Sequence, residues 1–291
     1  MTSLVMIDGR PMAPEAAKVS VFDRGFLYGD SVFEALRTYG GRPFALNRHL
    51  LRLARSASRV FIELPVSLEQ IGREVESAIV GAGNAESNVR LMLTRGVGEL
   101  LGLDPGLSRH PLRVVIVTPL KSPPPEAYLD GVGVVSYRTE RVTDYNAAAG
   151  AKVGNYLVAV LATREARAAG AHEALIVDAQ GRVVEGATSN VFAVLPDGTL
   201  VTPPEEDGIL LGITRETLLA VADELKLGVR LASLPLAELK GATEVFVCSS
   251  IRELVPVVSV DGERIGSGRP GPVSQQLLAA FREKCLKSVG L

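Results

Sequence analysis

The sequence predicts an α+β (mixed α/β) fold in two domains. Its 291 residues, 47% hydrophobic and 22% charged, have the composition of an ordinary globular protein. Strand-like and helix-like patterns alternate without the strict βαβ order of a doubly wound sheet. The proline-rich segment PLKSPPP at 119–125 favours extended structure. We therefore expect a small N-terminal domain over 1–120, a linker over 121–130 and a larger C-terminal domain over 131–291.

The N-terminal region begins with strands. A strand at 5–7 ends at Asp8-Gly9, a strong signal for a two-residue hairpin turn. A second hairpin joins 32–39 to 43–46 through Gly40-Gly41. Further β-rich runs cover 89–94 and 113–118.

Two helices are expected in the same region. Asn47 is the candidate N-cap of the first, whose apolar stripe contains Leu50, Leu51, Ala54, Ala57 and Phe61. The capping box Ser67-x-x-Gln70 begins the second helix, which ends near Gly81.

The C-terminal region mixes both kinds of element. We expect a hairpin over 174–185 that turns at Gln180-Gly181, and a turn at Asp197-Gly198. The expected strands are 132–137, 190–195 and 244–248, and the expected helices are 155–168, 214–226 (closed by Gly228) and a last one after Pro272.

Composition excludes several classes of partner. The formal net charge is −2, which gives no general attraction to nucleic acid or anionic lipid. No run approaches about 18 consecutive apolar residues, and the N-terminus lacks the features of a signal peptide. The two cysteines, Cys248 and Cys285, form no disulfide pattern. We expect a cytoplasmic protein that binds no nucleic acid and no membrane.

Two kinds of chemistry leave only weak signals. The three histidines, His49, His110 and His172, have no ligand spacing, so no metal site is expected. GSGRPG at 266–271 has the G-x-G-x-x-G pattern of dinucleotide-binding loops, but only 20 residues follow Gly271. A nucleotide-binding oxidoreductase therefore remains as a distant alternative.

Three local patterns suit a nucleophilic amine or a bound anion. Lys152 in AKVGNYL is flanked by small or apolar residues, where a lysine can act as a nucleophilic amine. Gly212-Ile213-Thr214 begins a helix, whose free N–H groups suit an anion. Arg48, Arg52, Arg55 and Arg59 lie along one side of a helix, either as a solvated face or with one of them binding an anion.

Taken together, these motifs resemble one family. AKVGNYL, Glu185 in VVEGATSNVF and LLGITRE at 210–216 are similar to segments of the class IV (fold type IV) pyridoxal-phosphate aminotransferases. DRGFLYGDSVFEALRTY at 23–39 and RHLLRL at 48–53 resemble the same family, in the same order. The resemblance implies a two-domain enzyme with pyridoxal 5'-phosphate bound between the domains.

The resemblance also implies a role for each matched residue. Lys152 is the Schiff-base lysine and the general base and acid of the reaction. Glu185 faces the pyridine nitrogen, and Tyr156, one helical turn after Lys152, bonds the phenolic oxygen. Arg52, Ile213, Thr214 and Ser250 bind the phosphate, and Leu210 packs on the ring.

Within the family, the branched-chain aminotransferases are most similar. Their substrate pocket is matched by Tyr28, Phe33, Arg90 and Tyr128. We expect transfer of an amino group between a branched-chain or other apolar L-amino acid and 2-oxoglutarate, two small-molecule substrates. Two residues depart from the pattern: Ala35 replaces a glycine and narrows the pocket by a methyl, and Asn88 replaces a tyrosine, which keeps open a D-amino-acid or (R)-amine transaminase. An aminodeoxychorismate lyase of the same family is a further alternative.

The expected assembly is a homodimer or a larger homo-oligomer. The mean hydropathy of +0.23, without a membrane segment, indicates apolar surface buried between subunits. The resembled family is likewise built on a two-fold dimer.

Overall fold

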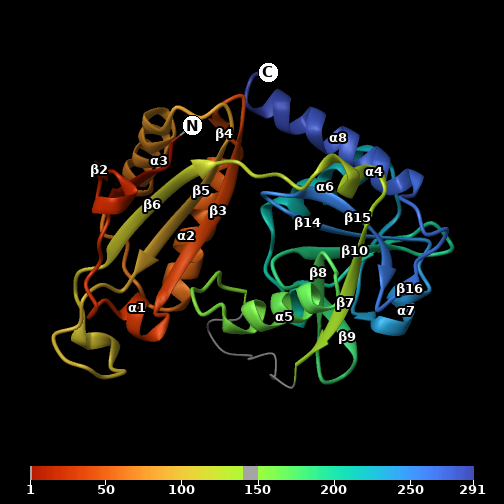
Figure 1. The fold of residues 1–291 in the computed structure, drawn as a ribbon, viewed down its shortest axis with the longest axis horizontal. Helices are drawn as coiled ribbons and strands as arrows, with labels where there is room; N and C mark the ends of the chain where they lie inside the picture. The colour runs from red at the N-terminus through yellow and green to blue at the C-terminus, as the bar shows by residue number, and fades with distance from the viewer. Residues whose placement is uncertain (1, 140–149) are drawn as a thin grey trace. The chain divides into compact units, whose positions relative to one another are not determined.

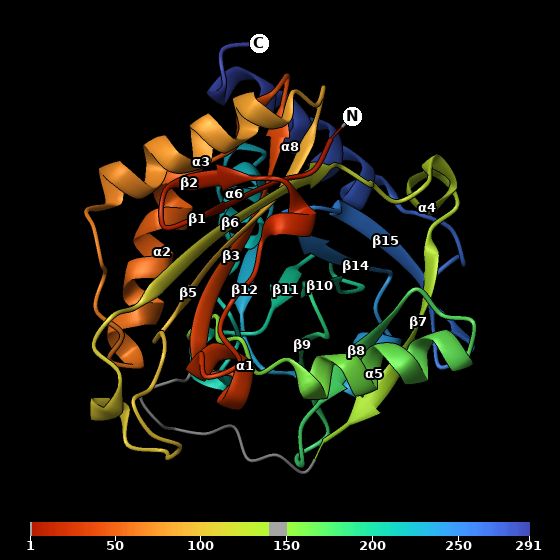
Figure 2. The same ribbon diagram turned by 60° about the vertical axis from the view of Figure 1, so that its left-hand side comes forward.

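The computed structural model describes residues 2–139 and 150–291, which form two compact units (Figures 1 and 2). The first unit contains Met1–Lys121, Ala151–Asn155 and Cys285–Leu291, and the second contains Ser122–Gly150 and Tyr156–Lys284. Two features differ from the expected domains. Pro125–Leu129, expected in a linker, forms helix α4, and Lys152 groups with the N-terminal part of the chain.

The first unit is built on an antiparallel sheet of six strands. In spatial order these are β2 (Arg10–Met12), β1 (Leu4–Ile7), β6 (Leu112–Pro119), β5 (Ser87–Thr94), β3 (Ser31–Tyr39) and β4 (Arg42–Pro43). Helices α2 (Leu46–Arg59) and α3 (Leu68–Ala82) share one apolar core with a single face of this sheet. The other helical segments are α1 (Arg24–Tyr28) and the short turns η1 (Pro14–Ala16) and η2 (Pro105–Leu107).

Turns and caps in this unit follow local chemistry. Asp8 and Gly9 both have positive φ angles, of 48° and 81°, so the predicted hairpin turn is confirmed. Ser67 accepts a hydrogen bond from the Gln70 backbone N–H and caps α3, as predicted. The helix ends at Ala82, close to the predicted end near Gly81, and Gly83 is its left-handed C-cap.

The prediction for the start of α2 was wrong. Asn47 lies inside the helix, which begins at Leu46 after Ala45 in a left-handed conformation. Leu51 and Phe61, expected in the apolar stripe, are exposed, whereas Leu50 and Ala57 are buried. The polar residues His49, Arg52 and Ser56 are also buried on the inward face of this helix.

The second unit contains a mixed sheet, which agrees with the predicted fold class. Within the described residues its strand order is β12 (Val229–Leu231), β11 (Leu200–Thr202), β10 (Asn190–Val194), β14 (Glu244–Ser249), β15 (Glu253–Val260), β7 (Val132–Arg138), β8 (Glu173–Val177), β9 (Arg182–Gly186) and β13 (Leu234–Pro235), with β16 (Glu263–Arg264) paired to β15. Three neighbouring pairs, β11 with β12, β15 with β7 and β7 with β8, are parallel.

Helices surround this sheet. They are α4, named above, α5 (Leu157–Ala168), α6 (Ile213–Glu224), α7 (Leu236–Lys240) and α8 (Pro272–Ser288), with the turn η3 at Glu205–Asp207. Helix α5 packs against β7 and β8 (Figure 1). In residues 2–139 and 150–291, no helix combines the length and the apolar composition needed to cross a membrane.

Candidate functional site

Lys152 lies in a short extended segment that pairs with the edge of β3. The Phe33 N–H donates to the Lys152 carbonyl at 2.9 Å, and the Gly154 N–H donates to the Ser31 carbonyl at 2.8 Å. A Cβ on Gly154 would lie 2.1 Å from the Ser31 Oγ, so this close approach requires glycine. The segment is therefore held at a defined register along β3.

This register determines where the lysine side chain points. Val153 forms a β-bridge with Val32 and packs against the core on the helix-covered face of the sheet. Side chains alternate along an extended strand, so the Lys152 side chain lies toward the opposite face. Its Nζ is 4.7 Å from the centroid of the Phe33 ring, which lies on that face.

Other residues expected in the substrate pocket share this face. Arg90 on β5 is directly opposite Ala35 on β3, and its Cζ is 4.0 Å from the Phe33 ring centroid. Asn88, two residues before Arg90, lies on the same side. The structure thus brings Lys152, Phe33 and Arg90 together, and the two residues that depart from the family pattern lie on the same face.

Arg52 differs from the other arginines of α2. It is buried, whereas Arg55 and Arg59 are exposed. Its Nε and Nη2 donate to the two carboxylate oxygens of Glu34, at 2.8 and 2.6 Å. This two-point contact fixes the plane of the guanidinium.

His49 completes a buried cluster with Glu34 and Arg52. Its Nδ1 lies 2.7 Å from Glu34 Oε2, and its Nε2 is buried without a hydrogen-bond partner. Burial would raise the pKa of Glu34, but the hydrogen bonds from Arg52 and His49 lower it to about 2. Burial lowers the pKa of His49, and the charges of Arg52 and Lys152 lower it further against the effect of Glu34. The ring is therefore neutral at pH 7, with its proton on Nδ1.

Sequence reasoning missed Glu34 and His49, although a signal was present. In a strand with alternating faces, Glu34 falls between Val32 and Leu36 on the face that enters the core. A carboxylate at such a position requires a partner. The spacing of His49 and Arg52, three residues apart on one helix, provides two.

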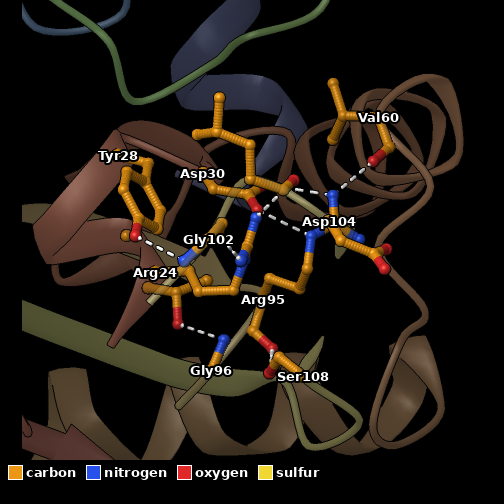
Figure 3. A network of polar contacts seen from close by, with 12 residues as sticks. Arg24, Tyr28, Asp30, Val60, Arg95, Gly96, Gly102, Asp104 and Ser108 are labelled. Carbon is orange, nitrogen blue, oxygen red and sulfur yellow. Dashed lines mark hydrogen bonds and ion pairs between the residues drawn. The ribbon is translucent and has the colours of Figure 1, made fainter. Parts of the chain in front are cut away.

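Tyr28, expected in the substrate pocket, contacts the loop that follows β5. It is the last residue of α1, and its hydroxyl accepts a hydrogen bond from the Gly102 N–H at 3.1 Å (Figure 3). Its side chain is partly exposed. The structure therefore places Tyr28 beside residues 96–108.

The same loop is held by a half-buried carboxylate between two arginines. Asp30 accepts hydrogen bonds from Arg24 and Arg95, and Arg24 also donates to the carbonyls of Gly102 and Leu103 (Figure 3). Burial raises the pKa of Asp30, but its bonds to Arg95 and Arg24 keep that pKa below its ordinary value. We call Arg24, Asp30 and Arg95 the loop clamp.

In the second unit, the structure brings Glu185 and Leu210 together. The Leu210 N–H donates to Glu185 Oε2 at 3.2 Å, and the Asn190 side-chain amide donates to the Leu210 carbonyl at 2.8 Å. Glu185 lies on β9 and is partly exposed. Asn190, which sequence reasoning missed, thus supports the residue that contacts Glu185.

Ile213 and Thr214 form the first turn of α6. The N-cap, Gly212, provides no side-chain hydrogen bond, and a Cβ there would lie 2.0 Å from Asn190 Oδ1. The Thr214 hydroxyl is buried and has no partner. Uncapped N–H groups beside an unpaired hydroxyl form a suitable receptor for an anion.

Ser250 and Tyr128 are linked through Arg252. Ser250 follows β14, and two residues later the Arg252 carbonyl accepts a hydrogen bond from the Tyr128 hydroxyl at 3.0 Å. The Arg252 guanidinium binds the buried Glu173 carboxylate at 2.8 and 3.1 Å. This pair, also missed from sequence, anchors the segment that contains Ser250.

The expected relation of Tyr156 to Lys152 was wrong. Helix α5 begins at Leu157 with Tyr156 as its N-cap, so Lys152 lies outside the helix and shares no helix face with Tyr156. The extended pairing of residues 152–154 with β3 replaces the expected first turn.

The glycine-rich pattern of the oxidoreductase alternative has a structural role. It follows the two-residue strand β16 and precedes α8. The N–H groups of Val273 and Ser274 donate to the Glu244 carboxylate at 2.9 and 2.8 Å. This helix terminus is therefore already bonded to a carboxylate. Among the described residues, no cluster of His, Cys, Asp or Glu could hold a metal ion.

Comparison with known proteins places the chain in one family. Residues 31–260 match the family described as amino-transferase class IV. A Methanocaldococcus jannaschii protein, provisionally named a branched-chain-amino-acid aminotransferase, is 36% identical over 96% of this chain and 95% of its own. The D-alanine aminotransferase of Bacillus licheniformis is 31% identical over 97% of both chains.

Solved structures agree with this result. The branched-chain amino acid aminotransferase of Escherichia coli superposes with a TM-score of 0.91 at 31% identity, covering 98% of this chain and 95% of its own. The T.th. enzyme of the same name, solved with pyridoxamine 5'-phosphate, has a TM-score of 0.90 at 30% identity over 97% and 94% of the chains. The 4-amino-4-deoxychorismate lyase of Pseudomonas aeruginosa reaches 0.84 at 33% identity over 96% and 98%. The chain therefore belongs to the class IV aminotransferases and is a pyridoxal-phosphate-dependent transaminase.

Proposed function

We propose that this enzyme transfers an amino group between a branched-chain or other apolar L-amino acid and 2-oxoglutarate. The observation that carries the proposal is the face of the first sheet on which Lys152, Phe33 and Arg90 lie. An apolar ring suits an aliphatic side chain, and a guanidinium next to it suits the second carboxylate of 2-oxoglutarate. One wall can therefore accept both substrates of a transaminase. The branched-chain aminotransferases among its relatives support the same choice.

The residues present fit the phosphate of the cofactor. The buried, unpaired Thr214 hydroxyl and the uncapped first turn of α6 supply donors, and Arg52 supplies a buried charge. In this proposal Ile213 and Ser250 also bind the phosphate, Leu210 packs on the ring, and Tyr156 bonds its phenolic oxygen. Glu185 faces the pyridine nitrogen.

The cofactor, when bound, acts as an electron sink for the carbon from which the proton is removed. Lys152 holds the cofactor and moves that proton as general base and acid. Phe33 keeps one side of the Lys152 amine apolar. The backbone pairing with β3 fixes the direction of the lysine side chain. Less entropy is therefore lost when the amine reaches a reactive geometry.

A D-amino-acid or (R)-amine transaminase is the second candidate, and the lyase reaction is a third. Asn88 and Ala35 lie on the same face as Arg90, and neither matches the branched-chain pattern. Relatives named D-alanine aminotransferase and a structural neighbour that is a 4-amino-4-deoxychorismate lyase support keeping these alternatives.

The first prediction concerns Lys152. Lys152→Ala should remain folded, because its backbone bonds to β3 do not need the side chain, but turnover should fall at least about 10²–10⁴-fold. Borohydride reduction followed by peptide mass spectrometry should find the cofactor on Lys152 in the wild type and on no residue in the variant. Lys121→Ala, at an exposed position, is the control. Near wild-type turnover by the Lys152 variant would refute the assignment.

The second prediction concerns Arg52. Arg52→Ala should weaken binding of pyridoxal phosphate by roughly 10–150-fold, because a charge-assisted bond is worth about 1.5–3 kcal/mol. Arg55→Ala, an exposed arginine on the same helix, should bind normally. Arg52→Gln removes the charge but keeps an amide donor beside Glu34, and it tests affinity if the alanine variant unfolds. Normal affinity in a folded Arg52 variant would exclude its phosphate role.

The third prediction concerns substrate choice and Arg90. L-Leucine or L-valine with 2-oxoglutarate should be the best pair in a panel that includes D-alanine, both enantiomers of 1-phenylethylamine and aminodeoxychorismate. Arg90→Ala should slow the 2-oxoglutarate half-reaction roughly 10–150-fold and change the leucine half-reaction far less, as measured in single turnovers. Equal losses would make Arg90 structural, and a preference for D-alanine would replace the branched-chain proposal.

The fourth prediction is a homodimer. The loop held by the loop clamp exposes Leu100, Leu101 and Leu103 by 70%, 68% and 78%, and α1 exposes Phe26 by 68%. Apolar side chains on a well-anchored segment are typical of a surface that binds another subunit. Light scattering should give twice the chain mass of 30.8 kDa, and Leu101→Asp should shift the protein toward monomer. A monomeric wild type at micromolar concentration would count against the dimer.

A further inference from the structure

Burying Glu34, His49 and Arg52 costs more free energy than filling the same space with apolar side chains would. Glu34 and His49 are fully buried, and Arg52 is 5% exposed. Burying an ion pair rarely adds stability relative to apolar side chains of similar size, because both charges lose their water. A buried ring nitrogen without a partner adds a further cost. These costs point to a role in binding.

Both basic residues of the cluster are oriented by one carboxylate. Glu34 Oε2 accepts from Arg52 Nη2 and lies 2.7 Å from His49 Nδ1. His49 and Arg52 are three residues apart on α2, so they lie on the same side of the helix. The carboxylate that directs the Arg52 guanidinium therefore also fixes the orientation of the imidazole and of its unpaired Nε2.

We propose that His49 is a second ligand of the cofactor phosphate beside Arg52, and that it takes up a proton from solvent when the phosphate binds. The inference rests on the proposed phosphate role of Arg52. The proton binds to the free lone pair of Nε2, which then donates to a phosphate oxygen, while Nδ1 keeps donating to Glu34. The only new covalent bond in the protein is the Nε2–H bond, and its proton comes from solvent.

The charges around His49 support this coupling. The charged groups that act on its pKa are Glu34 on β3, Arg52 on its own helix and Lys152 in the segment paired with β3. Without an anion, burial and the two cations keep the pKa of His49 below its ordinary value, and the ring is neutral. A bound phosphate dianion adds negative charge beside it, which favours the imidazolium.

The test reads the protonation of His49 directly. The protein, with ¹⁵N in its histidine rings, gives only three sets of ring signals, and His110→Gln and His172→Gln assign His49 by elimination. At pH 7 the ring should carry one proton, on Nδ1, without cofactor, and two protons after saturation with pyridoxamine phosphate. Absorbance titration first establishes binding. Failure to bind would overturn the proposed function as well, whereas binding with an unprotonated Nε2 would overturn only the role of His49.

Affinity measurements against pH provide a second test. Because the bound state holds one more proton, the part of the affinity that depends on His49 falls as pH rises, by up to about tenfold per unit between the two His49 pKa values. His49→Gln should remove this slope, and His110→Gln, at an exposed position, should retain it. Comparing the variants cancels the titration of the phosphate itself. An unchanged slope in folded His49→Gln would also overturn the proposal, and the wild-type ring signals decide it if that variant does not fold.

Discussion

The pairing of residues 152–154 with the edge of β3 is the contact on which the candidate site of the first unit depends. Two backbone hydrogen bonds join parts of the chain that are far apart in sequence. They put Val153 into the core and thereby direct Lys152 to the other face, toward Phe33. A shift by one residue would exchange the two side chains and bury the lysine. The Lys152 amine is therefore positioned by main-chain geometry.

The two faces of the first sheet carry different groups of charged side chains. One face presents Lys152, Phe33 and Arg90, and the other directs Glu34 to the helix that contains His49 and Arg52. Side chains alternate along β3, so the neighbouring residues Phe33 and Glu34 point to opposite faces of the sheet. One strand thus contributes a side chain to each group. The buried negative charge of Glu34 is neutralised by Arg52, which is buried beside it.

The features that were predicted best from the sequence are those that depend on local chemistry. The turn at Asp8-Gly9 and the Ser67 cap depend on residues adjacent in the chain, and both were found. Strand β15 was missed, since Pro256 interrupts its pattern and central strands seldom contain proline. The resemblance predicted roles for Lys152, Arg52 and Glu185, but the contacts of Arg52 with Glu34 and of Leu210 with Glu185 depend on tertiary packing. The same holds for the assignment of residues 151–155 to the first unit.

The loop clamp has a consequence for how this enzyme can diversify. Arg24 binds the loop through the carbonyl oxygens of Gly102 and Leu103, and Tyr28 binds it through the Gly102 N–H. Main-chain groups are present whatever side chains a sequence carries, so neighbouring positions such as Leu100 and Leu101 can change without loss of the anchor. The loop can therefore accumulate substitutions while its path is preserved. Because its attachment does not depend on side-chain identity, evolution or a directed-mutagenesis library can vary its sequence at little cost in folding.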